Sequence, residues 1–321
     1  MKRLTFWAIT TAAMLASCNN HDKSEQEILP NGRKAITFQV SEQPLTRYKA
    51  ESATIDSLTR EGSGFNVTAV AGEEKIIDYA TFFANESGEC EADDGAAYFW
   101  PDGDSVVSFY AYYPSSYYDY EVQPCTLNVA DGTMLIRPDG ETDIMAAHFE
   151  GNADTNDGNV FFNFKHLLSQ ISIYVSCDEQ DIFYPEIVLD GLSIEAPESS
   201  NYDFNTGKVV AENMTREYTF VKNTISVYDF PEYIGTAMIP ASSPIVDEGM
   251  VKKQTSCTLK VAYAVLTNSG KKSYEKSLNI SLAAGYRSTL KIVLSSNNVV
   301  AIISSVVVEE WQEDDGEIGC L

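Results

Sequence analysis

Short runs in which apolar and polar residues alternate follow one another along most of this chain, and helical periodicity is nearly absent. Alternation with a period of two puts every second side chain on one face, as in a half-buried β-strand. Clusters of Asp, Asn, Gly, Pro and Ser separate the runs, which predicts an all-β protein. The clearest expected strands are Ile36–Val40, Phe65–Val70, Val106–Tyr113, Phe162–Phe164, Ile171–Val175, Ile187–Leu189, Leu259–Tyr263 and Leu290–Leu294.

The length of 321 residues exceeds what one hydrophobic core usually serves, so two domains are expected. A polar loop ends at Asp157-Gly158, and a fresh strand run begins at Val160. We therefore predict two β-sandwich domains in tandem, at residues 35–158 and 159–321.

The N-terminus carries the pattern of a bacterial lipoprotein signal. Lys2 and Arg3 precede an apolar run, and the stretch Leu15-Ala16-Ser17 leads directly to Cys18. This pattern predicts a signal peptide at residues 1–17, export, and lipidation of Cys18. The apolar run is too short for a permanent membrane helix. Residues 18–34 are polar and aperiodic, which predicts a flexible tether.

The formal net charge is -25, and the basic residues occur only in short clusters such as Lys252-Lys253 and Lys271-Lys272. Binding to nucleic acid needs a concentrated positive surface, so a nucleic-acid partner is excluded. Binding along an anionic membrane surface is disfavoured for the same reason.

Few residues suggest catalysis. The chain has three histidines, and His166 is expected to be a structural residue at a strand edge because no nucleophile motif accompanies it. Acidic clusters such as Asp154–Gly158 are explained by turn chemistry, and none completes a calcium-binding loop. We expect no enzyme, no metal and no cofactor.

Five cysteines remain beside Cys18, an odd number that rules out complete pairing within one chain. Cys90 with Cys125 and Cys177 with Cys257 are conceivable disulfides. Spacing alone does not distinguish these pairs from buried thiols.

An aromatic stretch offers a binding-face hypothesis. Tyr112, Tyr117 and Tyr118 are candidate ligand contacts, because exposed tyrosines present flat apolar faces with a polar tip. On this hypothesis the protein is a monomeric surface glycan-binding lipoprotein. The competing interpretation is that Phe109 and alternating tyrosines fill the core.

Two arginines lie in the polar connection between the expected strands at Ile36 and Phe65. Arg47 and Arg60 would be open to a trypsin-like protease there, and a cut would free the first strand. A sheet that loses a strand exposes hydrogen-bonding edges and an apolar groove, which a strand from another molecule can fill. Ordinary surface arginines are the alternative.

The order of several short motifs resembles the fimbrillin family, the Mfa-like and FimA-like pilus lipoproteins of Bacteroidales. The motifs are the lipobox ending at Cys18, Ile36-Thr37-Phe38, Leu45-Thr46-Arg47, Tyr98-Phe99-Trp100-Pro101, Phe109-Tyr110-Ala111-Tyr112-Tyr113-Pro114, Asp143-Ile144-Met145-Ala146, Phe164-Lys165-His166-Leu167-Leu168-Ser169-Gln170-Ile171, Gly285-Tyr286 and Trp311.

This resemblance implies two transthyretin-like β-sandwich domains and a pilus subunit or pilus-associated adhesin at the outer membrane. Its partners would be other pilus subunits and a surface receptor. A protease would cut at Arg47, with Arg60 in reserve, and subunits would then join by donor-strand exchange. The displaced strand would contain Ile36, Phe38 and Val40. Donor-strand candidates are Val300, Ile302, Val306 and Val308, although this segment also fits a last core strand. Stalk, anchor and tip roles all remain open.

Overall fold

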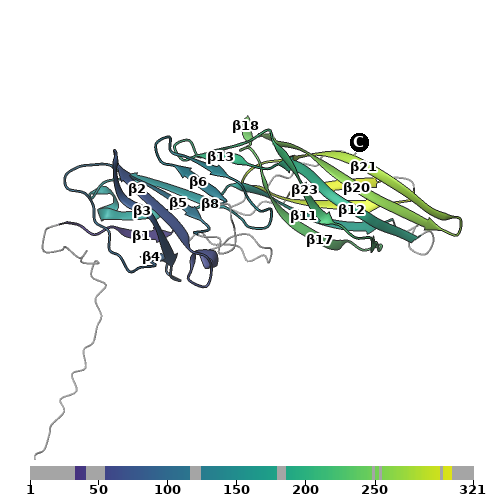
Figure 1. The fold of residues 1–321 in the computed structure, drawn as a ribbon, viewed down its shortest axis with the longest axis horizontal. Helices are drawn as coiled ribbons and strands as arrows, with labels where there is room; N and C mark the ends of the chain where they lie inside the picture. Colours follow the sequence, from purple (N-terminus) through teal and green to yellow (C-terminus); the bar gives the residue numbers. More distant parts are fainter. Residues whose placement is uncertain are drawn as a thin grey trace, which may run out of the picture.

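The computed structural model describes residues 33–40, 55–115, 124–178, 186–247, 250–252, 255–296 and 299–305. Nearly all regular structure in these ranges is β-strand, beside two short 3-10 helices, η1 (Ile55–Leu58) and η2 (Thr155–Gly158). The all-β prediction is therefore confirmed. Figure 1 shows an elongated molecule in which the first half of the described chain forms one lobe and the second half forms another along the same axis.

One eight-stranded sheet wraps around the core of the first lobe. Met145 of β8 and Phe162 of β9 belong to a single buried cluster although their strands stand near opposite ends of the strand order. The order is β10 (Lys165–His166), β8 (Met145–Gly151), β5 (Val107–Tyr113), β2 (Phe65–Ala71), β3 (Glu74–Ala84), β4 (Glu89–Ala92), β1 (Thr37–Val40) and β9 (Asn159–Phe162).

Two sheets that pack face to face form the second lobe. A single buried cluster draws Ile173 from one sheet and Leu259 from the other, so this core lies between them as in a β-sandwich. One sheet has the order β17 (Glu232–Pro240), β11 (Leu168–Cys177), β22 (Arg287–Leu294) and β23 (Val299–Ser305). The other has the order β15 (Thr215–Val221), β12 (Glu186–Pro197), β20 (Thr255–Thr267) and β21 (Gly270–Leu282), with β16 (Ile225–Ser226) also paired to β12.

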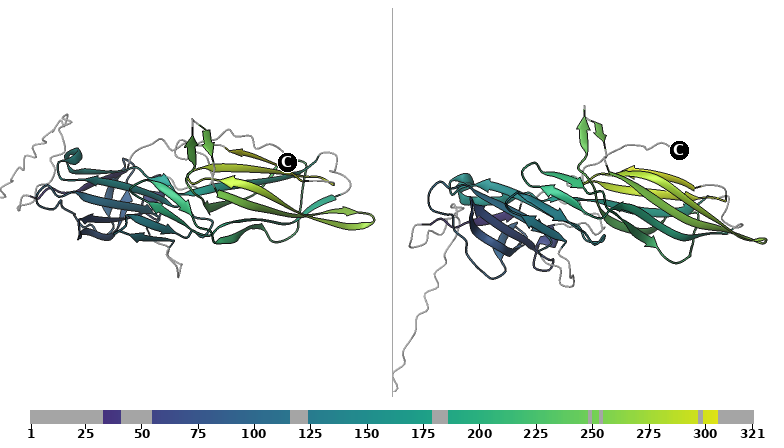
Figure 2. Two further views of the ribbon diagram at one scale, coloured as in Figure 1. Left: turned by 90° about the horizontal axis from the view of Figure 1, so that it is seen from above. Right: turned by 45° about the horizontal axis from the view of Figure 1, so that its top comes forward.

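A smaller sheet joins the two lobes because each half of the chain contributes two of its strands. Its order is β14 (Lys208–Ala211), β13 (Ser200–Asp203), β7 (Thr133–Ile136) and β6 (Cys125–Asn128). Tyr202 of β13 stands opposite Met134 of β7, and both belong to a third buried cluster that also contains Tyr110 and Met238. The lobes therefore share a core. A separate hairpin of β18 (Ile245–Asp247) and β19 (Met250–Lys252) projects from the second lobe in Figure 2.

Two predicted boundaries lie elsewhere in the structure. Both β9 and β10 follow Gly158 but pair in the first sheet, so sheet membership changes only between His166 and Leu168. The sequence pattern identified the strand at Val160 but not the sheet that it joins. The tether also ends before residue 34, since the ammonium group of Lys34 donates to the Ala153 carbonyl at 2.7 Å.

Candidate functional site

β1 lies inside the first sheet, between two strands that come from distant parts of the sequence. It pairs antiparallel with β4, where Gln39 faces Glu89, and parallel with β9, where Phe38 faces Val160. Because β1 is hydrogen-bonded on both sides, its removal would leave two unpaired strand edges separated by a gap.

The apolar face of β1 fills the centre of the first core. The Phe38 side chain is 3% exposed, and its ring centroid lies 4.7 Å from that of Phe82 and 5.9 Å from those of Phe109 and Phe162. Ile36 and Val40, the other two residues of the predicted displaced strand, are buried in the same cluster. Burying a side chain of this size contributes about 1.5–3 kcal/mol. Because aromatic rings surround Phe38, removal of β1 would leave a strongly apolar groove.

Backbone contacts hold both ends of the β1 segment. The amide of Ile36 donates to the Tyr98 carbonyl at 2.9 Å, and that of Val40 donates to the Gly88 carbonyl at 2.8 Å. Gly88 has φ of 80°, and a Cβ built there would lie 2.6 Å from the Val40 carbonyl oxygen. The turn before β4 thus needs glycine both for its left-handed conformation and for its close approach to β1.

Cys90 of β4 is directly opposite Phe38 in the ladder. Burial raises the pKa of its thiol to about 12, and the thiol donates to the Gly88 carbonyl at 3.4 Å. Burial likewise raises the pKa of Cys257 to about 12 in the second lobe. Neither conceivable disulfide forms, because Cys90, Cys125, Cys177 and Cys257 are all present as thiols. Cys18 and Cys320 lie outside the described residues.

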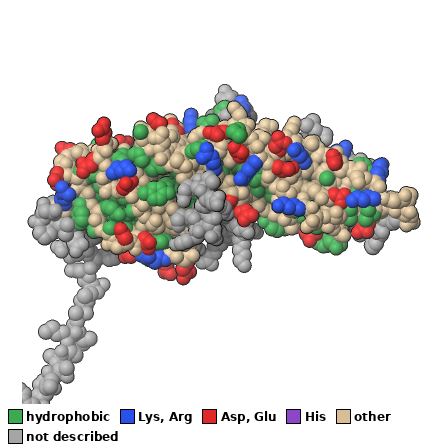
Figure 3. All heavy atoms as spheres, viewed as in Figure 1, with side chains coloured by type: hydrophobic (Ala, Val, Ile, Leu, Met, Phe, Trp, Pro, Cys, Tyr) green, Lys and Arg blue, Asp and Glu red, His purple; other side chains and the backbone are tan. Residues whose placement is uncertain are grey.

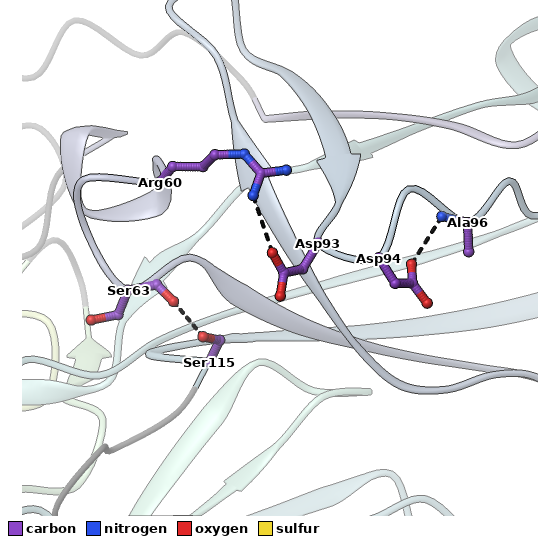
Figure 4. A network of polar contacts seen from close by, with 6 residues as sticks. All are labelled: Arg60, Ser63, Asp93, Asp94, Ala96 and Ser115. Carbon is purple, nitrogen blue, oxygen red and sulfur yellow. Dashed lines mark hydrogen bonds and ion pairs between the residues drawn. The ribbon is translucent and has the colours of Figure 1, made fainter.

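Arg60 lies on an exposed turn after η1, but neighbouring side chains hold it. Its guanidinium group forms an ion pair with Asp93 at 3.1 Å and lies 4.6 Å from the centroid of the Phe83 ring. Figure 4 shows this ion pair. It also shows that the Ser115 hydroxyl group, just after β5, donates a hydrogen bond to the Ser63 carbonyl and so holds the same turn. Arg47, the other candidate cleavage position, lies outside the described residues.

An open depression of about 760 Å³ lies between the Arg60 turn and the β3–β4 hairpin. Four glutamates line it: Glu61, Glu86, Glu89 and Glu91. Since Glu89 faces Gln39 across the ladder, the depression adjoins the C-terminal end of β1.

Tyr112 is not a surface contact, contrary to the ligand-contact hypothesis. Its side chain is 2% exposed, and its ring packs 5.9 Å from that of Tyr79. The small shared sheet covers the outer face of β5, so Tyr110 and Tyr112 fill the third core while Phe109 fills the first. The remaining candidate contacts, Tyr117 and Tyr118, lie outside the described residues.

His166 is a buried structural residue, as its sequence context predicts. Its Nδ1 lies 2.5 Å from Asp143 Oδ2, and the other carboxylate oxygen accepts the Ile144 amide at 2.8 Å. Asp143 was not identified from sequence, because a lone aspartate before a strand gives no signal of a partner at position 166. Among the described residues, no three His, Cys, Asp or Glu side chains are grouped to hold a metal.

The predicted donor segment begins in β23, which pairs with β22 and stands at the edge of its sheet in the part of the chain that the structure describes. Val300 pairs with Val293 and Ile302 pairs with Lys291. Val306 and Val308 lie outside the described residues. Within the described residues, β23 is thus the edge strand that follows β22 in this sheet.

The described structure holds neither a clustered metal site nor a helix with the length and apolar character needed to cross a bilayer. The chain has two all-β lobes, and its early strand β1 completes the first core. Comparison with known proteins assigns such a chain to the class of fimbrial proteins. The sequence model of the fimbrillin-like family matches residues 47–311, and the chain belongs to this family.

Two solved structures show the same fold. A fimbrial protein from Bacteroides vulgatus has 16% identity and a TM-score of 0.60, covering 85% of this chain and 98% of its own. A candidate cell adhesion protein from Bacteroides uniformis has 16% identity and a TM-score of 0.50, covering 88% of this chain and 99% of its own. The search of curated proteins gave no significant match.

Proposed function

We propose that this chain is a structural pilus subunit or pilus-associated adhesin that assembles by donor-strand exchange at the outer membrane. In this scheme, export follows the signal at residues 1–17, and lipid on Cys18 holds the precursor at the membrane. A protease then cuts between β1 and η1, and a strand from another pilus subunit replaces β1. Membership in the fimbrillin-like family supports the fimbrial part of this proposal.

The observation that carries the proposal is the position of β1. An internal strand that is joined to the rest of its lobe only through residues 41–54 can be removed by one cut in that connection. The strand is held by backbone bonds and by Phe38 packing, not by a covalent cross-link. Its loss would leave the rings of Phe82, Phe109 and Phe162 facing an open groove. A strand of similar alternation can restore both the ladder and the core.

Arg47 is the preferred cleavage position in this proposal. Proteases bind their substrates as an extended chain. Arg60 instead lies in a turn that is closed by a hydrogen bond from the Gly62 amide to the Thr59 carbonyl at 3.1 Å. Its side chain is also held by Asp93 and Phe83. A cut after Arg60 would also release Leu58, which is 3% exposed in the first core. A cut after Arg47 would leave this residue in place.

The donor in this proposal is the C-terminal segment that includes Val300, Ile302, Val306 and Val308. Val300, Ile302, Val306 and Val308 fall on one face of an extended strand, together with Ser304, and their apolar side chains match the groove-facing set Ile36, Phe38 and Val40. The proposed partners are therefore other pilus subunits. Nucleic acid is not among them, and Figure 3 shows Lys and Arg scattered among acidic side chains on the face in view.

Treatment with an arginine-specific protease tests the proposal. We expect the wild-type chain to yield a new N-terminus at Tyr48 and then a ladder of high-molecular-weight species. Arg47→Ala should stay uncut at that position and monomeric, whereas Arg60→Ala should behave like the wild type. A chain that ends at Ser305 should be cut but form no ladder, because it lacks Val306 and Val308.

Two results would refute this assembly route. One is a wild-type chain that loses residues up to Arg47 and remains monomeric at high concentration. The other is a ladder that forms equally well from Arg47→Ala. Mass spectrometry of the precursor from cells tests the lipid separately, since a diacyl or triacyl adduct on Cys18 is expected.

A further inference from the structure

Three aromatic side chains stand out into solvent where the chain passes from β16 to β17 in the second lobe. Tyr228 is 50% exposed, Phe230 is 57% exposed and Tyr233 is 51% exposed. This group lies away from β1 and from the donor segment, and β17 can be located at the edge of the second lobe in Figure 1. Clustered exposed aromatic rings, unlike single ones, mark a candidate binding surface.

The rings are held in defined orientations. Those of Tyr228 and Phe230 stack in parallel, with centroids 5.4 Å apart and planes 3° apart. The Tyr233 ring packs 5.5 Å from that of Tyr174, and its hydroxyl group donates to Thr236 Oγ1 at 2.8 Å. The aromatic surface is therefore preorganised, which reduces the entropy lost when a ligand binds.

The backbone of this connection is anchored to the sandwich at two points. The Cys177 amide donates to the Tyr228 carbonyl at 2.6 Å, and the Val227 amide donates to the Ile187 carbonyl at 3.1 Å. These bonds attach the aromatic segment to β11 and β12, one strand from each sheet. The exposed rings thus stand on a rigid base and not on a loosely held loop.

A depression of about 570 Å³ adjoins the rings, between the edge strands β15 and β17. Aromatic and aliphatic side chains form part of its wall, and polar side chains stand beside them. The lining residues are Phe220, Val221, Lys222, Asn223, Ile225, Ser226, Tyr228, Glu232, Tyr233 and Ile234. A depression that offers both aromatic faces and several polar groups suits a ligand that itself has an apolar face and hydroxyl groups.

We propose that this depression, together with the exposed rings of Tyr228, Phe230 and Tyr233 beside it, binds a neutral hexopyranose chain. The C–H face of a pyranose ring packs flat on an aromatic ring, and its hydroxyl groups both donate and accept hydrogen bonds. Asn223 supplies an amide, while Lys222 and Glu232 supply a donor and an acceptor at the same depression. With a formal net charge of -25 the protein repels polyanionic glycans, whereas a neutral sugar meets no such repulsion.

Addition of a strand from a second copy is the main competing occupant, and the geometry of β17 opposes it. The β11–β17 ladder changes register between Ile173 and Tyr174, whose partners are Gly235 and Tyr233, so Ile234 is an extra residue in β17. A bulge at a sheet edge interrupts the row of backbone groups that an added strand needs.

Binding of the full chain to hexasaccharides of glucose, mannose and galactose, measured by isothermal titration calorimetry, tests the proposal. We expect at least one of them to bind and a hyaluronan hexasaccharide not to bind. The double variant Tyr228→Ala/Phe230→Ala should lose about 5- to 150-fold in affinity, because each aromatic contact is worth about 0.5–1.5 kcal/mol and two are removed. Phe161→Ala is the matched control, since it removes a ring that is 41% exposed in the first lobe.

Phe230→Leu separates ring stacking from general hydrophobic contact. It keeps an apolar side chain but removes the flat face, so affinity should fall, whereas Phe230→Tyr should retain it. The absence of binding to all three neutral hexasaccharides would overturn the proposal, as would equal binding by the double variant. A concentration-dependent dimer that the double variant abolishes would instead identify a second copy as the occupant and would also overturn it.

Discussion

Phe38 of β1 and Cys90 of β4 stand directly opposite each other in the antiparallel ladder of the first sheet. The aromatic side chain sits in the core, and the thiol beside it has a pKa raised to about 12 by burial. The thiolate is the reactive form of cysteine, and burial disfavours it. Since β1 covers Cys90, the reactivity of this thiol should depend on whether a strand occupies the β1 position.

Alkylation of Cys90 should therefore report the loss of β1. At pH 8 a thiol with a pKa near 12 is about a thousandfold less ionised than one at its ordinary value of 9.0, so iodoacetamide should react slowly with the intact chain. Cleavage between β1 and η1 should speed labelling of Cys90, and polymerisation should slow it again. Peptide mass spectrometry measures the rates.

The thiol of Cys257 is the internal control for this labelling. Its pKa is also raised to about 12 by burial, but it lies in the second core. Its rate should not change on cleavage. Equal acceleration at both cysteines would indicate general unfolding and contradict selective loss of β1.

Truncation of the Phe38 ring should destabilise the intact precursor. Phe38→Ala removes a ring that contacts Phe82, Phe109 and Phe162, so the free energy of unfolding should fall by about 3–5 kcal/mol. Urea denaturation followed by circular dichroism measures it. Phe161→Ala, which changes a 41% exposed ring on the neighbouring strand, should alter stability by less than about 0.5 kcal/mol. Equal effects of the two substitutions would contradict a central role of Phe38 in the core.

The third core should couple the unfolding of the two lobes. Phe204, from the second half of the chain, is 4% exposed and packs 5.1 Å from the ring of Tyr110 in the first half. Phe204→Ala should lower the unfolding free energy by about 3–5 kcal/mol and separate one calorimetric transition into two. The control is Met214→Ala, at a position 65% exposed, which should leave the transition unchanged. A wild-type chain that already shows two independent transitions would refute the coupling.

Asp190 should make the second lobe less stable in acid. A hydrogen bond from Lys271, followed by one from Thr224, lowers the pKa of Asp190 below its ordinary value of 3.8. The folded state therefore binds this proton less readily than the unfolded state. The resulting stability is present above pH 4 and is lost as the pH falls through the folded-state pKa.

Asp190→Asn tests the sign of this dependence. Near neutral pH the variant should be less stable than the wild type by about 0.5 kcal/mol, because Lys271 is about half exposed and solvent weakens the pair. The difference should shrink below pH 4. Asp229→Asn makes the same change of charge and should show a smaller difference. A difference between Asp190→Asn and wild type that is independent of pH would contradict the assignment.

The positions of many strands could be predicted from the sequence, because alternation of apolar and polar residues reflects burial of one face of a strand. The runs beginning at Phe65, Ile171 and Leu290 lie within β2, β11 and β22. The run from Phe162 to Phe164 was only partly correct, since β9 ends at Phe162 and Phe164 packs from the following connection against Phe65.

The aromatic sites show where a local pattern is insufficient. Tyr112 was predicted to be exposed because a strand with one solvent-facing side exposes alternate residues. In the structure, the first core buries one face of β5 and the small shared sheet covers the other. No alternating pattern marks the exposed aromatic residues of the second lobe, because Tyr228 and Phe230 lie in the connection after β16 and Tyr233 lies at the start of β17. Only the tertiary structure shows that the Tyr228 ring stacks on that of Phe230 and that Tyr228 and Tyr233 line the same depression.

The sequence by itself determined the all-β class, the strand positions and the motif order that identified the family, because these depend on the local period of apolar residues and on short motifs. The tertiary structure decided which sheet each strand joins, that β1 lies between β4 and β9, and that Phe38 faces Cys90. Strand pairing depends on contacts between residues far apart in the chain, and the period of a single strand does not encode its partner.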